Sequence, residues 1–299
     1  MSLFRSIKKI SGVLVAVMIL SLSALPVFAA TTIEVKHVTD ISVSEDNWWD
    51  RGVQYGRILV LNNQPEEENN VLLATHCELN SGLTENAPGY PIYRSTDNGK
   101  TWKVITRVTD TLTGANSEWN PTLFELSKPC GDYPAGTIIL AACSIDPEHN
   151  KESHIRLYFS LDGGYTFDQG VVVASAGGLE EGVWEPFLTQ LDDGGLVCFY
   201  SDDSDPKHAQ TIVYKQSKDG INWDKAVTVV ASENPEERPG MPIVTRLSDG
   251  SYFMVYEIFN KADKEIENIE KMGAQFNYNK KLGRDFTIEG LKAEYDAVH

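Results

Sequence analysis

Four hairpin-like segments recur along the chain, and this repeat restricts the fold more than any other feature. Each segment is an apolar run that ends in leucine, a turn, and a second apolar run. The last two segments turn through Asp-Gly pairs, a strong hairpin signal. The leucines lie 65, 65 and 56 residues apart, at Leu61, Leu126, Leu191 and Leu247. This spacing is typical of one four-stranded propeller blade per repeat, so the sequence predicts an all-β fold with about four recognisable blades.

A second motif lies between the hairpins. Residues 95–102 and 160–167 share the frame Ser-x-Asp-x-Gly-x-Thr-aromatic, and residues 217–223 hold a shortened copy. We expect the Asp to cap backbone amides, the Gly to adopt a positive φ, and the aromatic side chain to pack between sheets. The frame resembles the Asp-box, or BNR repeat, of sialidase-like β-propellers. It indicates the fold and does not indicate a reaction.

Two sets of equivalent positions hold the candidate catalytic residues. One set stands immediately before the first strand of each hairpin, and the other at the end of the second strand. Each set contains a single carboxylate; the sets are Tyr55, Asn120, Glu185 and Met241, and Cys77, Ser144, Ser201 and Glu257. Two carboxylates that face one pocket are what glycoside hydrolysis needs. The alternative is that each glutamate is a solvated or salt-bridged surface group, with Arg238 and Arg246 as candidate partners.

The residues around the two glutamates carry a resemblance to a known family. Segments 184–202 and 238–257, together with residues 133–140, are similar to glycoside hydrolase family 93. Members of that family are six-bladed exo-α-1,5-L-arabinanases that release arabinobiose with retention of configuration. The resemblance implies Glu185 as the nucleophile and Glu257 as the acid/base. A retaining reaction then requires carboxyl groups ~5–5.5 Å apart, an ionised nucleophile, and an acid with a raised pKa.

Further side chains near the inner strand ends are candidate substrate-binding groups. Trp184 and Tyr55 are candidates for stacking on sugar faces, whereas blade packing is the better interpretation of Trp119. Candidate hydroxyl-binding groups are Arg57, Asn120, Asp202 and Arg238. The sequence contains no metal-ligand cluster, nucleotide loop or phosphate-binding glycine motif, so we expect no cofactor.

The charge and the N-terminal segment bear on partners and location. The 299 residues include 26 Lys and Arg against 43 Asp and Glu, a formal charge of -17. Such acidity argues against nucleic acid as the main partner and fits a neutral one, such as cell-wall arabinan or arabino-oligosaccharides.

Residues 1–30 predict a secretory signal peptide, with a basic start, an apolar run over 13–20 and cleavage after Ala29 or Ala30. An uncleaved membrane anchor over residues 10–28 is the alternative. We expect a secreted monomer that is not attached to the membrane after cleavage.

The expected organisation is a signal peptide (1–30), a partial β-propeller (31–260) and a charged tail (261–299). Residues 261–271 predict a helix rather than another blade, so the chain is shorter than six blades require. Two other functions remain open: a sialidase, and a catalytically silent carbohydrate-binding or adhesion propeller.

The four cysteines allow one disulfide or buried thiols on strands, and their spacing does not suggest zinc; they are Cys77, Cys130, Cys143 and Cys198.

Overall fold

The computed structural model describes residues 41, 53–78, 89–113, 117–145, 152–177 and 181–259. All of them belong to one compact unit, Thr39–His299. The described residues contain β-strands and one short 3-10 helix, Glu66–Glu68, but no α-helix. The all-β prediction is therefore confirmed. The expected signal peptide, the charged tail and its helix over 261–271 lie outside the described residues.

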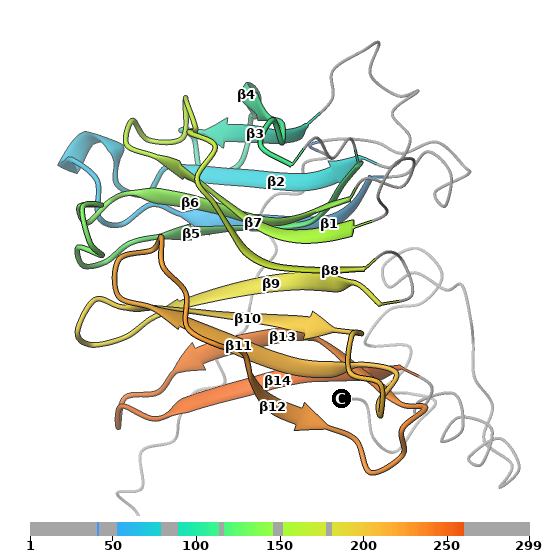
Figure 1. Cartoon of the computed structure of the whole chain (residues 1–299). Helices are drawn as coiled ribbons and strands as arrows, with labels where there is room; N and C mark the ends of the chain where they lie inside the picture. Colours follow the sequence, from blue (N-terminus) through green and yellow to red (C-terminus); the bar gives the residue numbers. More distant parts are fainter. Residues whose placement is uncertain are drawn as a thin grey trace, which may run out of the picture. The chain divides into compact units, whose positions relative to one another are not determined.

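The strands form four antiparallel sheets, each of which follows the order of the chain (Figure 1). The first sheet contains β1 (Val53–Val60), β2 (Leu72–Glu78), β3 (Tyr90–Ser95) and β4 (Lys103–Val108). The second contains β5 (Ser117–Glu125), β6 (Ile138–Ile145), β7 (Glu152–Ser160) and β8 (Val171–Gly177). The third contains β9 (Val183–Gln190), β10 (Leu196–Asp202), β11 (Thr211–Ser217) and β12 (Val227–Ala231). The fourth has two strands within the described residues, β13 (Arg238–Arg246) and β14 (Tyr252–Phe259).

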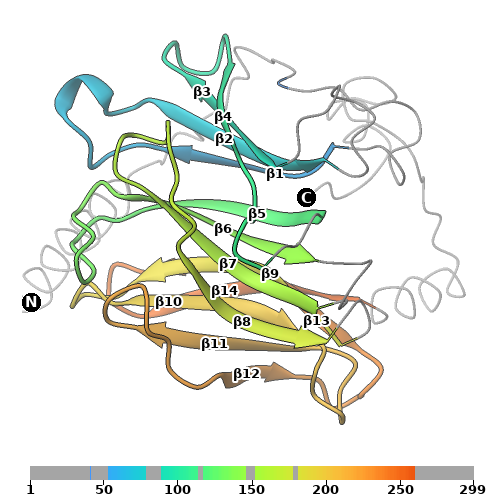
Figure 2. The same cartoon turned by 45° about the horizontal axis from the view of Figure 1, so that its top comes forward.

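The first strands of the four sheets are neighbours. β5 contacts both β1 and β9, and β9 contacts β13 (Figure 2). Each of the four predicted hairpins is the first strand pair of a sheet, namely β1–β2, β5–β6, β9–β10 and β13–β14. Residues that occupy equivalent places on the first strands are thereby brought side by side.

Two apolar cores lie between successive sheets. Strand β6 is buried along its whole length and supplies both of them. Ile138 and Leu140 point into the core shared with the first sheet, whereas Ile139 and Ala141 point into the core shared with the third. Because side chains alternate across a strand, a strand covered on both faces is apolar at most positions. The exception in β6 is Ser144, whose hydroxyl lies 3.2 Å from that of Tyr158. Burial on both faces explains the apolar run of β6.

The three Asp-boxes form the turns between the third and fourth strands of their sheets, as predicted. In the first, Asp97 Oδ1 accepts the Thr101 N–H at 2.9 Å, and Asp97 Oδ2 accepts the Thr101 hydroxyl at 2.7 Å. Gly99 has a φ of 82°. The aromatic residues of the second and third copies, Phe167 and Trp223, pack against the two cores.

The cysteines are buried and free. Cys77, Cys130, Cys143 and Cys198 all lie in described strands or turns and none forms a disulfide. Burial raises the pKa of each thiol. Of the two interpretations of the cysteines, buried thiols are confirmed.

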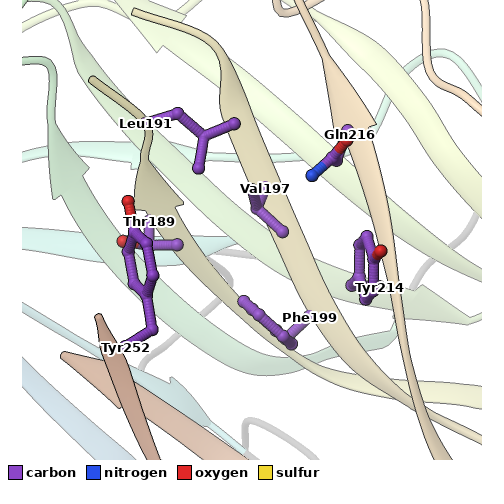
Figure 3. A pocket seen from close by; sticks show the side chains of 7 residues that line it. All are labelled: Thr189, Leu191, Val197, Phe199, Tyr214, Gln216 and Tyr252. Carbon is purple, nitrogen blue, oxygen red and sulfur yellow. The ribbon is translucent and has the colours of Figure 1, made fainter. Parts of the chain in front are cut away.

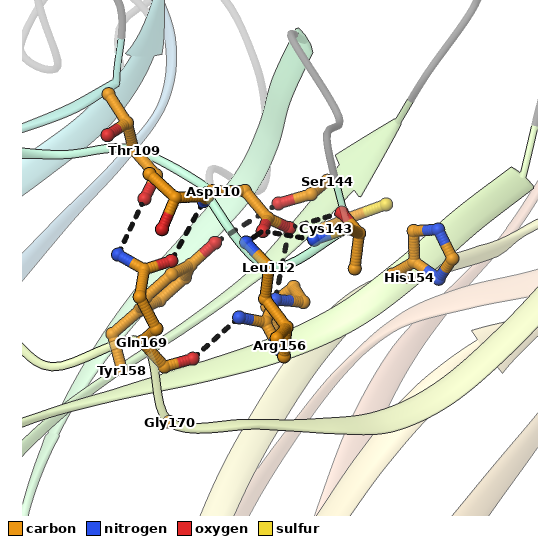
Figure 4. A network of polar contacts seen from close by, with 12 residues as sticks. Thr109, Asp110, Leu112, Cys143, Ser144, His154, Arg156, Tyr158, Gln169 and Gly170 are labelled. Atoms are coloured by element: carbon orange, nitrogen blue, oxygen red, sulfur yellow. Dashed lines mark hydrogen bonds and ion pairs between the residues drawn. The ribbon is translucent and has the colours of Figure 1, made fainter. Parts of the chain in front are cut away.

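A buried ion pair connects the segment after β4 to β7 (Figure 4). Arg156 Nε donates to Asp110 Oδ2 at 3.0 Å, and both side chains are fully buried. Arg156 also donates to the Gln169 carbonyl oxygen at 2.6 Å, and the Gln169 side chain donates to the Thr109 carbonyl oxygen at 3.1 Å. Burial alone would raise the pKa of Asp110, but donors from Thr113 and the charge of Arg156 outweigh it and the pKa is lowered. This network joins β7 to the segment that follows β4 and to the segment that precedes β8.

Candidate active site

One backbone irregularity recurs at the same place in each first strand. Tyr55, Asn120, Glu185 and Met241 have φ values of 58°, 48°, 59° and 51°, in the left-handed region that side chains other than glycine rarely adopt. The strand pairing shifts register at each of them. We expected these residues to precede the first strands, and that placement is wrong: they lie within β1, β5, β9 and β13. Strand pairing continues on both sides of each of these residues, which form β-bulges. A bulge interrupts the alternation of side chains by which a strand is recognised in the sequence, so the strands seemed to begin later than they do.

A cavity of about 390 Å³ opens beside these bulges. Its wall contains eight residues of the first strands and three from other segments. Its wall is formed by Gln54, Tyr55, Trp119, Asn120, Trp184, Glu185, Arg238, Met241, Cys77, Asp203 and Gln210. The structure therefore brings together five of the predicted site residues: Tyr55, Asn120, Trp184, Glu185 and Arg238.

Glu185 is held at one of its two carboxyl oxygens. The Ser201 hydroxyl donates to Glu185 Oε2 at 2.7 Å, and the Met241 backbone N–H donates to the same atom at 2.7 Å. Burial raises the pKa of Glu185, and the negative charge of Glu257 adds to the rise, while the two donors oppose it. A side chain at Gly240 would collide with this arrangement, because an added Cβ would lie 2.9 Å from Glu185 Oε2.

Glu257 lies on β14, opposite Gly240 on β13. Gly240 is followed by Met241, which bonds to Glu185, and the charge of Glu257 acts on both Glu185 and Tyr55. Glu257 is exposed and does not belong to the cavity wall formed by the described residues. We expected a raised pKa at Glu257 and none at Glu185, whereas burial raises the pKa of Glu185.

Asp203, which the sequence did not single out, occupies the place expected for Asp202. Asp203 Oδ2 accepts hydrogen bonds from Arg238 Nη2 at 2.7 Å and from Trp184 Nε1 at 3.1 Å. Asp202 instead accepts the backbone N–H of Ser204 at 2.8 Å and so caps a turn. Among the described residues, Asp203 belongs to the cavity wall and Asp202 does not. The structure therefore does not bring Asp202 together with the other predicted site residues.

Arg57 is close to the site without forming its wall. Its guanidinium carbon lies 4.0 Å from the centre of the Tyr55 ring. Burial raises the pKa of Tyr55 and the Glu185 charge raises it further, while Arg57 opposes the shift. Tyr55 therefore stays a neutral hydroxyl at neutral pH, able to donate or accept a hydrogen bond. Gln54 and Gln210 also belong to the wall, and their residue types gave no signal in the sequence. Cys77, the remaining wall residue, stood in the second set of equivalent positions.

A second cavity, of about 230 Å³, lies between the third sheet and β14 (Figure 3). It contains no carboxylate and no basic side chain; its wall is formed by Thr189, Leu191, Val197, Phe199, Tyr214, Gln216 and Tyr252. Of these two cavities, the one beside Glu185 is the candidate active site.

Within the part of the chain that the structure describes, there is no metal-binding cluster of His, Cys, Asp and Glu. Among the same residues, no helix is long and apolar enough to cross a membrane.

Comparison with known proteins places these observations in a family. A family model described as a BNR repeat-like domain matches residues 72–256. The chain belongs to this family. A search of the curated proteins found no significant match.

Solved structures add a narrower similarity to this BNR repeat-like protein. It is 38% identical to a Penicillium chrysogenum α-L-arabinanase complexed with arabinobiose, with a TM-score of 0.62 over 69% of this chain and 57% of that one. It is 35% identical to a GH93 α-L-arabinofuranosidase of Fusarium graminearum, also in complex with arabinobiose, with a TM-score of 0.62 over 69% of this chain and 56% of that one. The chain thus spans a little more than half the length of these relatives. The resemblance to glycoside hydrolase family 93 and the sialidase-like propeller fold are confirmed.

Proposed function

We propose that this protein hydrolyses α-1,5-linked L-arabinan, in an exo-acting and retaining manner, and releases arabinobiose. The observation that carries the proposal is a half-buried glutamate, Glu185, fixed in the wall of a cavity at the inner ends of the blades. Identities of 35–38% with arabinan-degrading enzymes solved with arabinobiose support the substrate class. Cell-wall arabinan and arabino-oligosaccharides are the proposed partners.

Glu185 is the proposed nucleophile. Both hydrogen-bond donors that hold its carboxyl group act on Oε2, which leaves Oε1 to attack the anomeric carbon. These donors favour the ionised form that attack requires. Bond formation between Glu185 and the sugar breaks the glycosidic bond, and the leaving oxygen takes its proton from Glu257. Glu257 then removes a proton from water as the water oxygen attacks the anomeric carbon. The bond between that carbon and Glu185 breaks, and the sugar leaves with its original configuration.

The remaining wall residues bind and orient the sugar in this proposal. Trp184 and Tyr55 offer flat faces to the furanose rings, and Asn120 offers an amide for the hydroxyl groups. Trp184 is fixed in its orientation because its indole N–H is bonded to Asp203. Arg57 lies behind Tyr55 and orients that ring.

The two other functions make different demands on the site. A sialidase needs arginines that are free to bind the carboxylate of the sugar, whereas Arg238 is already paired with Asp203. A silent carbohydrate-binding propeller needs no glutamate whose carboxyl group is fixed by two hydrogen bonds in its cavity. Both features favour the hydrolase.

We also propose that the protein is secreted after cleavage near Ala29, on the basis of the N-terminal sequence alone. The N-terminal sequence of the mature protein, recovered from the culture medium of an expressing cell, tests this. A start at Ala30 or Thr31 supports the proposal, and retention of residues 1–28 in a membrane fraction contradicts it.

The hydrolase proposal is tested by the products formed from linear α-1,5-arabinan. We expect arabinobiose from the wild-type protein, and loss of more than a thousandfold in Glu185→Gln and Glu257→Gln. Glu181→Gln is the matched control, since Glu181 is an exposed carboxylate four residues from Glu185 and outside the cavity wall. A folded wild-type protein that releases no product contradicts the proposal. Binding of arabinobiose without turnover in every variant would instead favour the silent propeller.

A further inference from the structure

The charges in the cavity wall suggest how the site selects its sugar. The wall of the candidate active site contains two carboxylates, Glu185 and Asp203, and one guanidinium, that of Arg238. Glu257 adds a further negative charge within electrostatic reach of Glu185. Among the described residues of the wall, Arg238 is the one cation, and it therefore determines whether an anionic ligand can bind.

Neighbouring groups already accept hydrogen bonds from three of the five N–H groups of Arg238. Nη2 donates to Asp203 Oδ2 at 2.7 Å and to Gln210 Oε1 at 2.6 Å, and Nη1 donates to the Ala209 carbonyl oxygen at 3.0 Å. The Arg238 side chain is nevertheless 33% exposed, whereas that of Asp203 is 1% exposed. The pairing places a neutralising carboxylate behind the arginine and leaves the arginine at the surface of the cavity.

The state of Asp203 indicates that it is more than a structural partner. Within the described part of the chain, its second oxygen, Oδ1, is buried and has no hydrogen-bond partner. A buried acceptor that lacks a partner destabilises the fold by about 1–3 kcal/mol. The carboxylate at position 203 therefore lowers the stability of the fold through Oδ1, although Oδ2 is bonded to Arg238 and Trp184.

We propose that Asp203 is a specificity-determining residue, which neutralises Arg238 and thereby excludes anionic sugars from the cavity. The inference rests on the proposed function, since it explains how a neutral arabinan chain is preferred over acidic sugars. Removal of the Asp203 charge leaves Arg238 as an unpaired cation at the cavity surface. A guanidinium of this kind binds a sugar carboxylate through charge-assisted hydrogen bonds.

The test compares galacturonate with its neutral counterpart galactose as probes, by titration calorimetry with the full chain. For Asp203→Asn we expect the affinity for galacturonate to rise about 10- to 100-fold relative to galactose, as one charged hydrogen bond supplies. Asp202→Asn is the matched control, because it removes the same charge one residue away, at a turn outside the cavity wall. In the double variant Asp203→Asn/Arg238→Gln, the gain must disappear.

The outcomes separate this inference from the proposed function. If Asp203→Asn does not gain affinity for galacturonate, or gains no more than Asp202→Asn, the inference is wrong. A gain that persists without Arg238 also overturns it. Should Asp203→Asn fail to fold, Asp203→Ser offers a smaller acceptor to Trp184 and the same result is expected. Arabinan hydrolysis by the wild-type protein is measured in parallel, and its absence would overturn the proposed function while the binding comparison still decides the role of Asp203.

Discussion

The backbone N–H of Met241 donates a 2.7 Å hydrogen bond to Glu185 Oε2, so the fourth sheet holds the carboxylate of the third. Met241 and Glu185 occupy equivalent bulges on β13 and β9, and both have left-handed backbones. The bulge of one blade thus presents a backbone donor to the side chain of the blade before it. Each left-handed residue destabilises the fold by about 1–2 kcal/mol. The packing of the sheets on either side offsets this cost.

Replacement of Ser201 by alanine tests the support of Glu185 from its own sheet. Ser201 Oγ donates to Glu185 Oε2, and this bond lowers the pKa of Glu185 against the effect of burial. In Ser201→Ala the pKa of Glu185 rises further, so the acidic limb of kcat/KM moves to higher pH. We expect about a tenfold lower kcat/KM on that limb, measured from pH 4 to 8 on an aryl glycoside of α-1,5-arabinobiose. Ser204→Ala is the control, and an unchanged acidic limb in Ser201→Ala would argue against an ionised nucleophile.

Gly240 is predicted to be required because of the space it leaves. An alanine Cβ would lie 2.9 Å from Glu185 Oε2 and still closer to the Gln210 side-chain nitrogen. Displacement of a reacting group by about 1 Å can reduce the rate about a hundredfold. We therefore expect Gly240→Ala to lower kcat by 10- to 100-fold, with the melting temperature as a check of folding. Gly177→Ala serves for comparison, because its Cβ would meet Glu181 at an ordinary 3.6 Å. Equal activities of the two variants would contradict the prediction.

The buried pair Asp110–Arg156 is expected to dominate the stability of the second sheet. Arg156→Met leaves an uncompensated buried carboxylate, which typically destabilises a protein by about 3–5 kcal/mol. Urea denaturation measures this loss. Arg246→Met breaks the exposed pair with Asp192 and should cost at most about 1 kcal/mol. A loss for Arg156→Met no greater than that for Arg246→Met would show that the buried pair does not stabilise the fold.

The Asp-boxes predict a loss of stability in acid. Donors from Thr101 and Ser95 lower the pKa of Asp97 from 3.8 to about 2, and similar donors lower the pKa of Asp162 and Asp219. A carboxylate whose pKa is lower in the folded than in the unfolded state contributes stability above the unfolded pKa. That contribution is lost as the pH falls through the folded pKa.

Wild-type protein should therefore lose stability between about pH 4 and pH 2, as circular dichroism at increasing urea concentrations would show. Asp97→Asn should be less stable at pH 7 and less sensitive to pH across that window. An equal pH dependence in the variant and the wild type would exclude Asp97 as a contributor.

The fold could be predicted from the sequence because its signal is repeated. The leucine spacing and the Asp-boxes each occur at least three times, so a departure in one copy does not hide the pattern. The same repeat identified Tyr55, Asn120, Glu185 and Met241 as equivalent. It could not show that they lie within strands, since a left-handed residue interrupts the alternation on which strand recognition depends.

Individual side chains at the site were harder to predict. Asp202 and Asp203 are neighbours of the same type where β10 ends, and only the three-dimensional structure shows that Asp203 is the one that bonds to Arg238. Gln210 belongs to the wall because it bonds to Arg238 and to the Pro239 carbonyl oxygen, contacts between segments far apart in the sequence. The exposure of Glu257 likewise depends on what packs beside β14 and not on its own residue type.

The most direct test of the proposed chemistry is to identify the residue that becomes covalently attached to the sugar. The wild-type protein would be incubated with an epoxide inhibitor that has the configuration of α-L-arabinofuranose, digested, and mapped by mass spectrometry. We predict a single label on the peptide that contains Glu185, at Glu185 itself, and no label in Glu185→Gln. A label on Glu257, or none on a folded protein that hydrolyses arabinan, would contradict the assignment of Glu185 as the nucleophile.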